Sequence, residues 1–110
     1  MKSKYKRMIR GIKKKERNFS DRKNNRKWFL YILQCHNGAF YTGITNDLQR
    51  RIQMHRDGKA SRYTRTRRPV KLLYSEICRS RIEALVREYK VKALPKIKKQ
   101  ELIVRKQERS

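Results

Sequence analysis

The segment YILQCHNGAFYTGITNDLQRRIQMH, residues 31–55, decides the fold that this sequence predicts. Asn37-Gly38 divides it, and an Asn-Gly pair is the strongest short signal for a β-hairpin because both residues tolerate positive φ. Residues on either side are aromatic and β-branched, as is typical of strands. We therefore expect a strand over 28–35, a tight turn, and a returning strand over 39–44.

The rest of the chain predicts helices and one more strand. Side chains at 45–47 can cap a helix that should end near Gly58, a residue suited to a helix C-terminus. Ser80 and Glu83 form a capping box that starts a second helix. The other predicted segments are a basic loop over 59–68, a strand over 70–77, and a last helix from Pro95 to Val104. The predicted class is α+β, a small three-stranded antiparallel sheet flanked by helices in the order β-β-α-β-α-α.

The charge balance points to a polyanionic partner. The chain has 110 residues, with 33 Lys and Arg against 9 Asp and Glu, for a formal charge of +24. No fold needs such an excess, and its self-repulsion is destabilising. Nucleic acid is the commonest partner of such a surface, and an acidic membrane surface is the competing one. No long apolar run is present, so we expect no membrane span and a cytoplasmic location.

The basic residues are unevenly distributed between two predicted regions. Residues 1–27 contain 13 basic and 2 acidic side chains and few apolar ones. This composition predicts a basic flexible arm, followed by a folded domain over 28–110. The alternative is that Met8, Ile9 and Ile12, which have helical spacing, pack on the domain. Cys35 and Cys78 fit neither a disulfide framework nor a zinc site, and we expect ordinary buried thiols.

Four side chains around the hairpin form a candidate site. Tyr31 and Tyr41 fall on adjacent strands, and Arg51 and His55 share one helix face because they are four residues apart. That face borders the apolar stripe of the helix, so it should be only partly exposed to solvent. The structural alternative is that the tyrosines pack across the hairpin and that His55 makes local contacts.

Glu88 is a further candidate on the second predicted helix. It lies at the edge of an apolar face formed by Ile82, Leu85, Val86, Tyr89 and Ala93. A carboxylate in such a place is costly unless it is paired or binds a cation. The alternatives to a cation are ion pairs with Arg81, Arg87 or Lys92.

Taken together, these residues resemble the GIY-YIG endonuclease family, most closely its small single-domain bacterial branch. Phe29-Leu30-Tyr31 stands where the family has GIY, and Tyr41-Thr42-Gly43 stands where it has YIG. Arg51, His55 and Glu88 occupy the positions of its other site residues. The resemblance covers residues 27–103 and implies the family's fold for the domain.

The resemblance also implies a divalent-metal-dependent, structure-directed DNA endonuclease. Nothing in the sequence indicates a base-reading element, so we expect little sequence preference. Glu88 would hold one Mg²⁺ or Mn²⁺, and Arg51 would contact phosphate oxygens. Tyr31 or Tyr41 would activate water, helped by Arg51 and the metal, which favour a phenolate, while His55 orients or shuttles a proton. The expected nucleic-acid contacts are Arg50, Lys59, Arg62, Tyr63, Arg65, Arg67 and Arg68, and the resemblance favours DNA over RNA as the partner. The alternative function is a non-catalytic protein that binds DNA or RNA and retains the fold.

Overall fold

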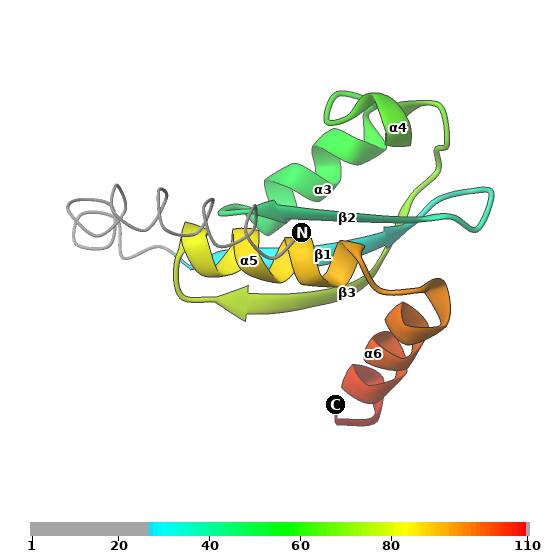
Figure 1. Cartoon of the computed structure of the whole chain (residues 1–110). Coiled ribbons are helices and arrows are strands. Elements are labelled where there is room, and N and C mark those ends of the chain that lie inside the picture. Colours follow the sequence, from blue (N-terminus) through cyan, green and yellow to red (C-terminus); the bar gives the residue numbers. More distant parts are fainter. Residues whose placement is uncertain (1–26, 110) are drawn as a thin grey trace.

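The computed structural model describes residues 27–109, and its centre is one antiparallel sheet (Figure 1). The strands are β1 (Trp28–Gln34), β2 (Phe40–Thr45) and β3 (Lys71–Cys78). Their order in the sheet is β2-β1-β3, so β1 is the central strand and pairs with both neighbours. The predicted α+β class with three antiparallel strands is therefore confirmed. The predicted arm lies outside the described residues, apart from Lys27.

The hairpin between β1 and β2 forms where the Asn37-Gly38 pair predicted it. The Gly38 backbone takes a φ of +86°, and its N–H donates to the Cys35 carbonyl over 2.9 Å. The Cys35 N–H in turn donates to the Ala39 carbonyl over 2.8 Å. Lys96 ties this turn to the far end of the chain, because its Nζ donates to the Gly38 carbonyl.

Four helices accompany the sheet in the described part of the chain. They are α3 (Leu48–Arg56), α4 (Arg62–Arg65), α5 (Arg81–Lys92) and α6 (Lys96–Arg109). Asp47 caps α3 by accepting the Arg50 N–H, and Ser80 caps α5 by accepting the Glu83 N–H.

Two helix predictions were wrong. Residues 59–68 are not all loop, because Ser61 caps the single-turn helix α4. The last helix continues past Val104 to Arg109, since no glycine or proline after Pro95 interrupts it.

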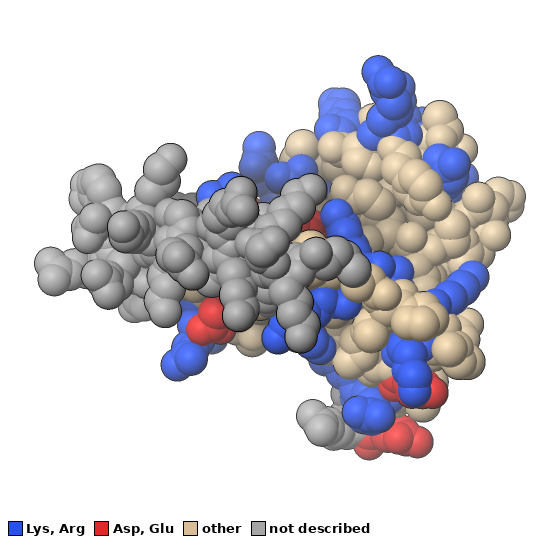
Figure 2. Space-filling model, viewed as in Figure 1, with Lys and Arg blue, Asp and Glu red and all other residues tan. Residues whose placement is uncertain are grey.

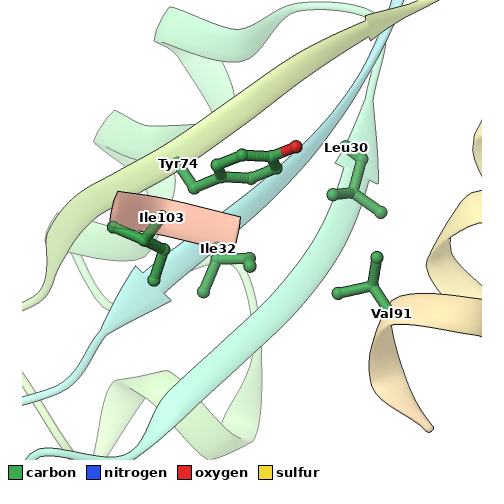
Figure 3. Packing of buried hydrophobic residues seen from close by; sticks show 5 residues of the cluster. All are labelled: Leu30, Ile32, Tyr74, Val91 and Ile103. Atoms are coloured by element: carbon green, nitrogen blue, oxygen red, sulfur yellow. The ribbon is translucent and has the colours of Figure 1, made fainter. Parts of the chain in front are cut away.

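The alternation of side chains along β1 builds one core on each face of the sheet. Leu30 and Ile32 point to one face, where they meet Tyr74 of β3, Val91 of α5 and Ile103 of α6 (Figure 3). On the other face, Tyr31, Leu33 and Cys35 meet Ile52 of α3 and Val70. The helices α5 and α6 thus cover one face and α3 covers the other. Both cysteines are buried free thiols, as expected.

The buried face of α5 differs from the predicted one. Its fully buried residues are Ala84 and Val91, whereas Ala93 of the predicted face is exposed. Apolar side chains occur almost all round this helix, so their spacing alone does not select one face. Glu88 lies four residues after Ala84 and three before Val91, which places it on the side that packs against the sheet.

Candidate active site

The Tyr31 phenol packs over a glycine of the neighbouring strand, Gly43. The two residues are paired in the β1–β2 ladder. A Cβ atom added to Gly43 would lie 2.5 Å from the Tyr31 hydroxyl oxygen and 2.7 Å from its Cζ atom. Any side chain at position 43 would therefore displace the phenol.

His55, in the last turn of α3, contacts the Tyr31 phenol directly. Its Nε2 lies 2.8 Å from the Tyr31 hydroxyl, and its Nδ1 lies 2.8 Å from the hydroxyl of Thr64. Only 1% of His55 is exposed. The Tyr41 ring meets the imidazole edge-on, with a centroid distance of 5.1 Å. Three of the predicted site residues are thus brought into contact.

A stack of side chains leads from Tyr41 to the surface. Tyr63 of α4 lies nearly parallel to Tyr41, with ring centroids 6.0 Å apart. The Arg67 guanidinium covers the Tyr63 ring at 3.8 Å from its centroid. A hydrogen bond of 2.9 Å from Arg67 to the Tyr63 carbonyl fixes that guanidinium. Tyr63 packs on Tyr41 and is 40% exposed.

Burial governs the protonation of the phenol at the centre of the site. Loss of solvent contact raises the pKa of Tyr31, and nearby Tyr41 and Glu88 raise this pKa further. Arg51 acts in the opposite direction, as expected, but does not outweigh burial. The Tyr31 phenol therefore keeps its proton at neutral pH. Because the charges of Arg51 and Glu88 both shift this pKa, both side chains lie within electrostatic range of the Tyr31 hydroxyl.

His55 is a neutral imidazole at neutral pH. Burial, reinforced by the positive charge of Arg51, lowers the pKa of His55 to about 4. A neutral ring has one N–H and one bare nitrogen, so it donates at one side and accepts at the other. His55 is thus suited to pass a proton rather than to store a positive charge.

Glu88 is a half-buried carboxylate on the sheet-facing side of α5. Its side chain is 20% exposed, and its Oε2 lies 3.4 Å from the Lys92 ammonium. This ion pair is one of the three alternatives that the sequence left open. Residues 27–109 contain no group of three or more His, Cys, Asp or Glu side chains that could form a complete protein cage for a metal.

The seven predicted nucleic-acid contacts lie on or close to α3 and α4. Arg50 is exposed on α3, and Lys59, Arg62 and Arg65 line a surface hollow together with Ser61. Arg67 and Arg68 also have structural roles, since both guanidiniums donate to backbone carbonyl groups. Figure 2 shows Lys and Arg side chains spread over the visible face and few acidic ones.

Thr64 is the functional candidate that the sequence reasoning missed. It is a fully buried polar residue, and its hydroxyl contacts both His55 and the hydroxyl of Ser61. A possible signal was present, because Ser61 lies three residues before it at the start of a helical turn. Its contact with the imidazole depends on how α4 packs against α3.

Comparison with known proteins identifies the family. The model of the GIY-YIG catalytic domain matches residues 27–100. This chain belongs to the GIY-YIG family. Its membership confirms the resemblance seen in the sequence, and it assigns the chain to a family of nucleases.

Individual relatives belong to the UPF0213 group of this family. One from Desulfotalea psychrophila is 52% identical over 77 residues, covering 69% of this chain and 70% of the relative. Another, from Staphylococcus saprophyticus, is 43% identical over 77 residues, covering 70% and 94%. A solution NMR structure of a UPF0213 protein from Bacillus halodurans is 42% identical, covers 71% of this chain and 83% of that one, and gives a TM-score of 0.48.

GIY-YIG membership implies a nucleic-acid partner, in agreement with the charge. Among residues 27–109, no helix is both long enough and apolar enough to cross a bilayer.

Proposed function

We propose that this GIY-YIG protein is a divalent-metal-dependent endonuclease that hydrolyses DNA phosphodiester bonds. One observation carries the proposal. A buried phenol, that of Tyr31, is hydrogen-bonded to a neutral imidazole and lies within electrostatic range of both Arg51 and Glu88. A site for phosphodiester hydrolysis needs a proton acceptor, a cation for the phosphate and a carboxylate for a metal, and these residues supply all three.

Each side chain has a role that its chemistry suits. Arg51 offers planar N–H donors to the phosphate oxygens. Tyr31 takes the proton of the attacking water while it gives its own proton to His55. Tyr41 is less buried than Tyr31, and its hydroxyl donates a hydrogen bond to the phosphate or to that water.

Glu88 is the residue that would hold the metal, and its surroundings fit one ion. Mg²⁺ keeps several waters and typically takes one or two carboxylates together with substrate phosphates. A single carboxylate that is 20% exposed suits that mode, whereas an ion that requires three protein ligands would not fit. When bound, Mg²⁺ or Mn²⁺ would neutralise charge on the phosphate and on the leaving oxygen. Lys92 would have to release Glu88 for this to occur.

The nucleic-acid surface would consist of the basic residues around α3 and α4. Arg50, Lys59, Arg62 and Arg65 are exposed and free to contact phosphates along the backbone. Tyr63 and Arg67 present a flat stacked pair that suits an unpaired base, because bases stack on aromatic rings and guanidinium planes. Such contacts carry little sequence information, so we propose a structure-directed enzyme.

A non-catalytic nucleic-acid-binding protein is the second candidate. Two observations favour it, the Glu88–Lys92 ion pair and the 2% exposure of Tyr31. If Glu88 stays paired with Lys92, it cannot bind a metal, and a phenol with so little solvent contact cannot activate water. The protein would then bind nucleic acid without cleaving it.

Nicking of supercoiled plasmid separates the two candidates. The purified chain is incubated with plasmid in Mg²⁺, in Mn²⁺ and in EDTA, and binding is measured in parallel by fluorescence anisotropy. We expect relaxed and linear products in metal only, and faster cleavage of flap or branched oligonucleotides than of duplex. Tight binding without cleavage of any DNA would support the second candidate. The RNA equivalents of the oligonucleotides test the preference for DNA.

A further inference from the structure

Thr64 is buried next to the candidate site and belongs to none of the family motifs. It has no exposed surface, and its hydroxyl lies 2.8 Å from His55 Nδ1 and 3.0 Å from the hydroxyl of Ser61. Since Tyr31 contacts the opposite ring nitrogen of His55, four side chains form a continuous hydrogen-bonded chain. Its order is Tyr31, His55, Thr64, Ser61.

The protons of this chain can be assigned by counting donors and acceptors. Within residues 27–109, the Tyr31 hydroxyl has one hydrogen-bond partner, His55 Nε2. A buried O–H group without an acceptor is costly, so Tyr31 donates and Nε2 accepts. A neutral imidazole then carries its proton on Nδ1, which donates to Thr64. The Thr64 hydroxyl is left to donate to Ser61, whose Oγ lies 3.0 Å away and whose carbonyl oxygen lies 3.4 Å away.

All donors in the chain therefore point the same way, from the phenol toward the surface. We propose that Thr64 and Ser61 form the outer half of a proton path, which carries the proton lost by the attacking water from Tyr31 through His55 to solvent. This inference rests on the proposed nuclease function and assigns to it two positioning residues outside the motifs.

The step balances in atoms and charge. The water oxygen forms a bond to phosphorus, the bond from phosphorus to the leaving oxygen breaks, and that oxygen takes a proton from solvent water. The water proton moves to the Tyr31 oxygen as the phenol proton moves to His55 Nε2. The Nδ1 proton passes to Thr64, the Thr64 proton to Ser61, and the Ser61 proton to solvent. Every residue ends neutral, one proton is released, and reversal of the hydroxyl rotors and the ring tautomer resets the chain.

The surroundings of His55 explain why a proton that reaches it has to leave through Thr64 and Ser61. The titratable and charged groups that face it are Tyr31 on β1, Tyr41 on β2 and Arg51 on its own helix, and on α4 it meets the Thr64 hydroxyl. Arg51 is cationic and the ring is buried, so a second proton on the imidazole is disfavoured. A proton that enters at Nε2 must leave at Nδ1, where Thr64 is the acceptor.

The chain ends at a surface where a proton can leave. Ser61 is partly exposed and lines the hollow formed with Lys59, Arg62 and Arg65. Positive side chains there oppose the retention of a proton at the end of the path.

The first test reads the tautomer directly and requires no catalysis. Side-chain ¹⁵N spectra of the full chain report which imidazole nitrogen is protonated, and the chain has only two histidines. His36 is exposed on the hairpin and serves as the internal reference. We expect His55 at pH 7 to carry its proton on Nδ1 and to keep it in Thr64→Ser, but to lose the Nδ1 hydrogen bond in Thr64→Val. A proton on Nε2 in the unsubstituted chain would overturn the proposed direction.

The second test measures single-turnover cleavage. Thr64→Val has the same shape but lacks the hydroxyl, and we expect it to slow the chemical step about tenfold or more with KM unchanged. Thr64→Ser should restore most of the rate. Equal rates for Thr64→Val and the unsubstituted chain, with melting curves alike, would refute the path. If the unsubstituted protein cleaves nothing, the nuclease proposal is refuted instead. The imidazole ¹⁵N spectra then still test the direction of the hydrogen bonds from Tyr31 to Ser61.

Discussion

Tyr31 occupies the space that a side chain at Gly43 would need. The two residues face each other across β1 and β2, and an added Cβ atom would meet the phenol oxygen at 2.5 Å. The last glycine of the YIG-like triplet therefore sets the position of the tyrosine of the GIY-like triplet. The two halves of the family signature act as one structural unit.

Gly43→Ala should consequently damage the site more than its small size suggests. Tyr31 would have to rotate away from β2, which breaks its 2.8 Å contact with His55. We expect a loss of about 1–3 kcal/mol in the free energy of unfolding, typical of overpacking, and a large loss of cleavage. Urea denaturation and plasmid nicking measure both. Gly38→Ala is the matched control, since Gly38 has open space around it but a positive φ, so it should lose stability without losing the site.

The two tyrosines should respond differently to loss of the hydroxyl. Tyr31→Phe removes the proton acceptor and leaves His55 Nε2 unpaired, so we expect a rate loss of about 10²-fold or more. Tyr41→Phe should have a smaller effect, through weaker contact with the phosphate. Tyr74→Phe is the control, because Tyr74 is a buried phenol on the opposite face that donates to Glu76. Normal cleavage by both site variants would make the tyrosines structural.

Glu88→Ala should abolish metal-dependent cleavage and leave DNA binding intact or slightly tighter, because one negative charge is lost. The comparison variant is Glu101→Ala, which removes the same charge and an ion pair with lysine, Lys98, on a different helix. Cleavage rates at several Mn²⁺ concentrations, together with anisotropy titrations, separate metal binding from DNA binding. Metal-dependent cleavage at the normal rate by Glu88→Ala would exclude its role as metal ligand.

His55 should make the fold sensitive to acid. Its pKa is about 4 in the folded chain, against an ordinary value of 6.5. Because the unfolded chain takes up the proton first, this contribution to stability is complete above about pH 6.5 and declines as the pH falls toward 4. The loss should amount to at most about 3 kcal/mol. Denaturation curves of the chain and of His55→Gln, compared between pH 7 and 4, isolate the effect from the carboxylates, and parallel curves would contradict it.

Deletion of the predicted arm should act through electrostatics. Residues 1–27 carry 13 of the 33 basic side chains. Each phosphate contact adds about −0.9 to the slope of log affinity against log salt, so removal of the arm should reduce that slope in magnitude by ~2–5. Cleavage at saturating DNA should persist. A lower melting temperature with an unchanged slope would instead favour an arm packed on the domain.

The parts of the site that follow local rules were predictable from sequence. An Asn-Gly turn and a capped helix suffice to bring Tyr31, Tyr41 and His55 together, since neighbouring strands and one helix face are fixed by short-range geometry. Thr64 was not predictable, because its contact with His55 depends on the packing of α4 against α3. The orientation of α5 was misjudged because burial of Ala84 is decided by the sheet rather than by hydrophobic spacing.

The position of Tyr31 on the central strand has a consequence for how substrate is admitted. Residues Leu30 to Leu33 are at most 2% exposed and are paired on both sides, so their amides should be among the slowest to exchange with deuterium. A reactive group on such a rigid support cannot move far to meet a phosphate. The nucleic acid would have to deform instead, and sequences or junctions that bend easily should be attacked before relaxed duplex of the same length.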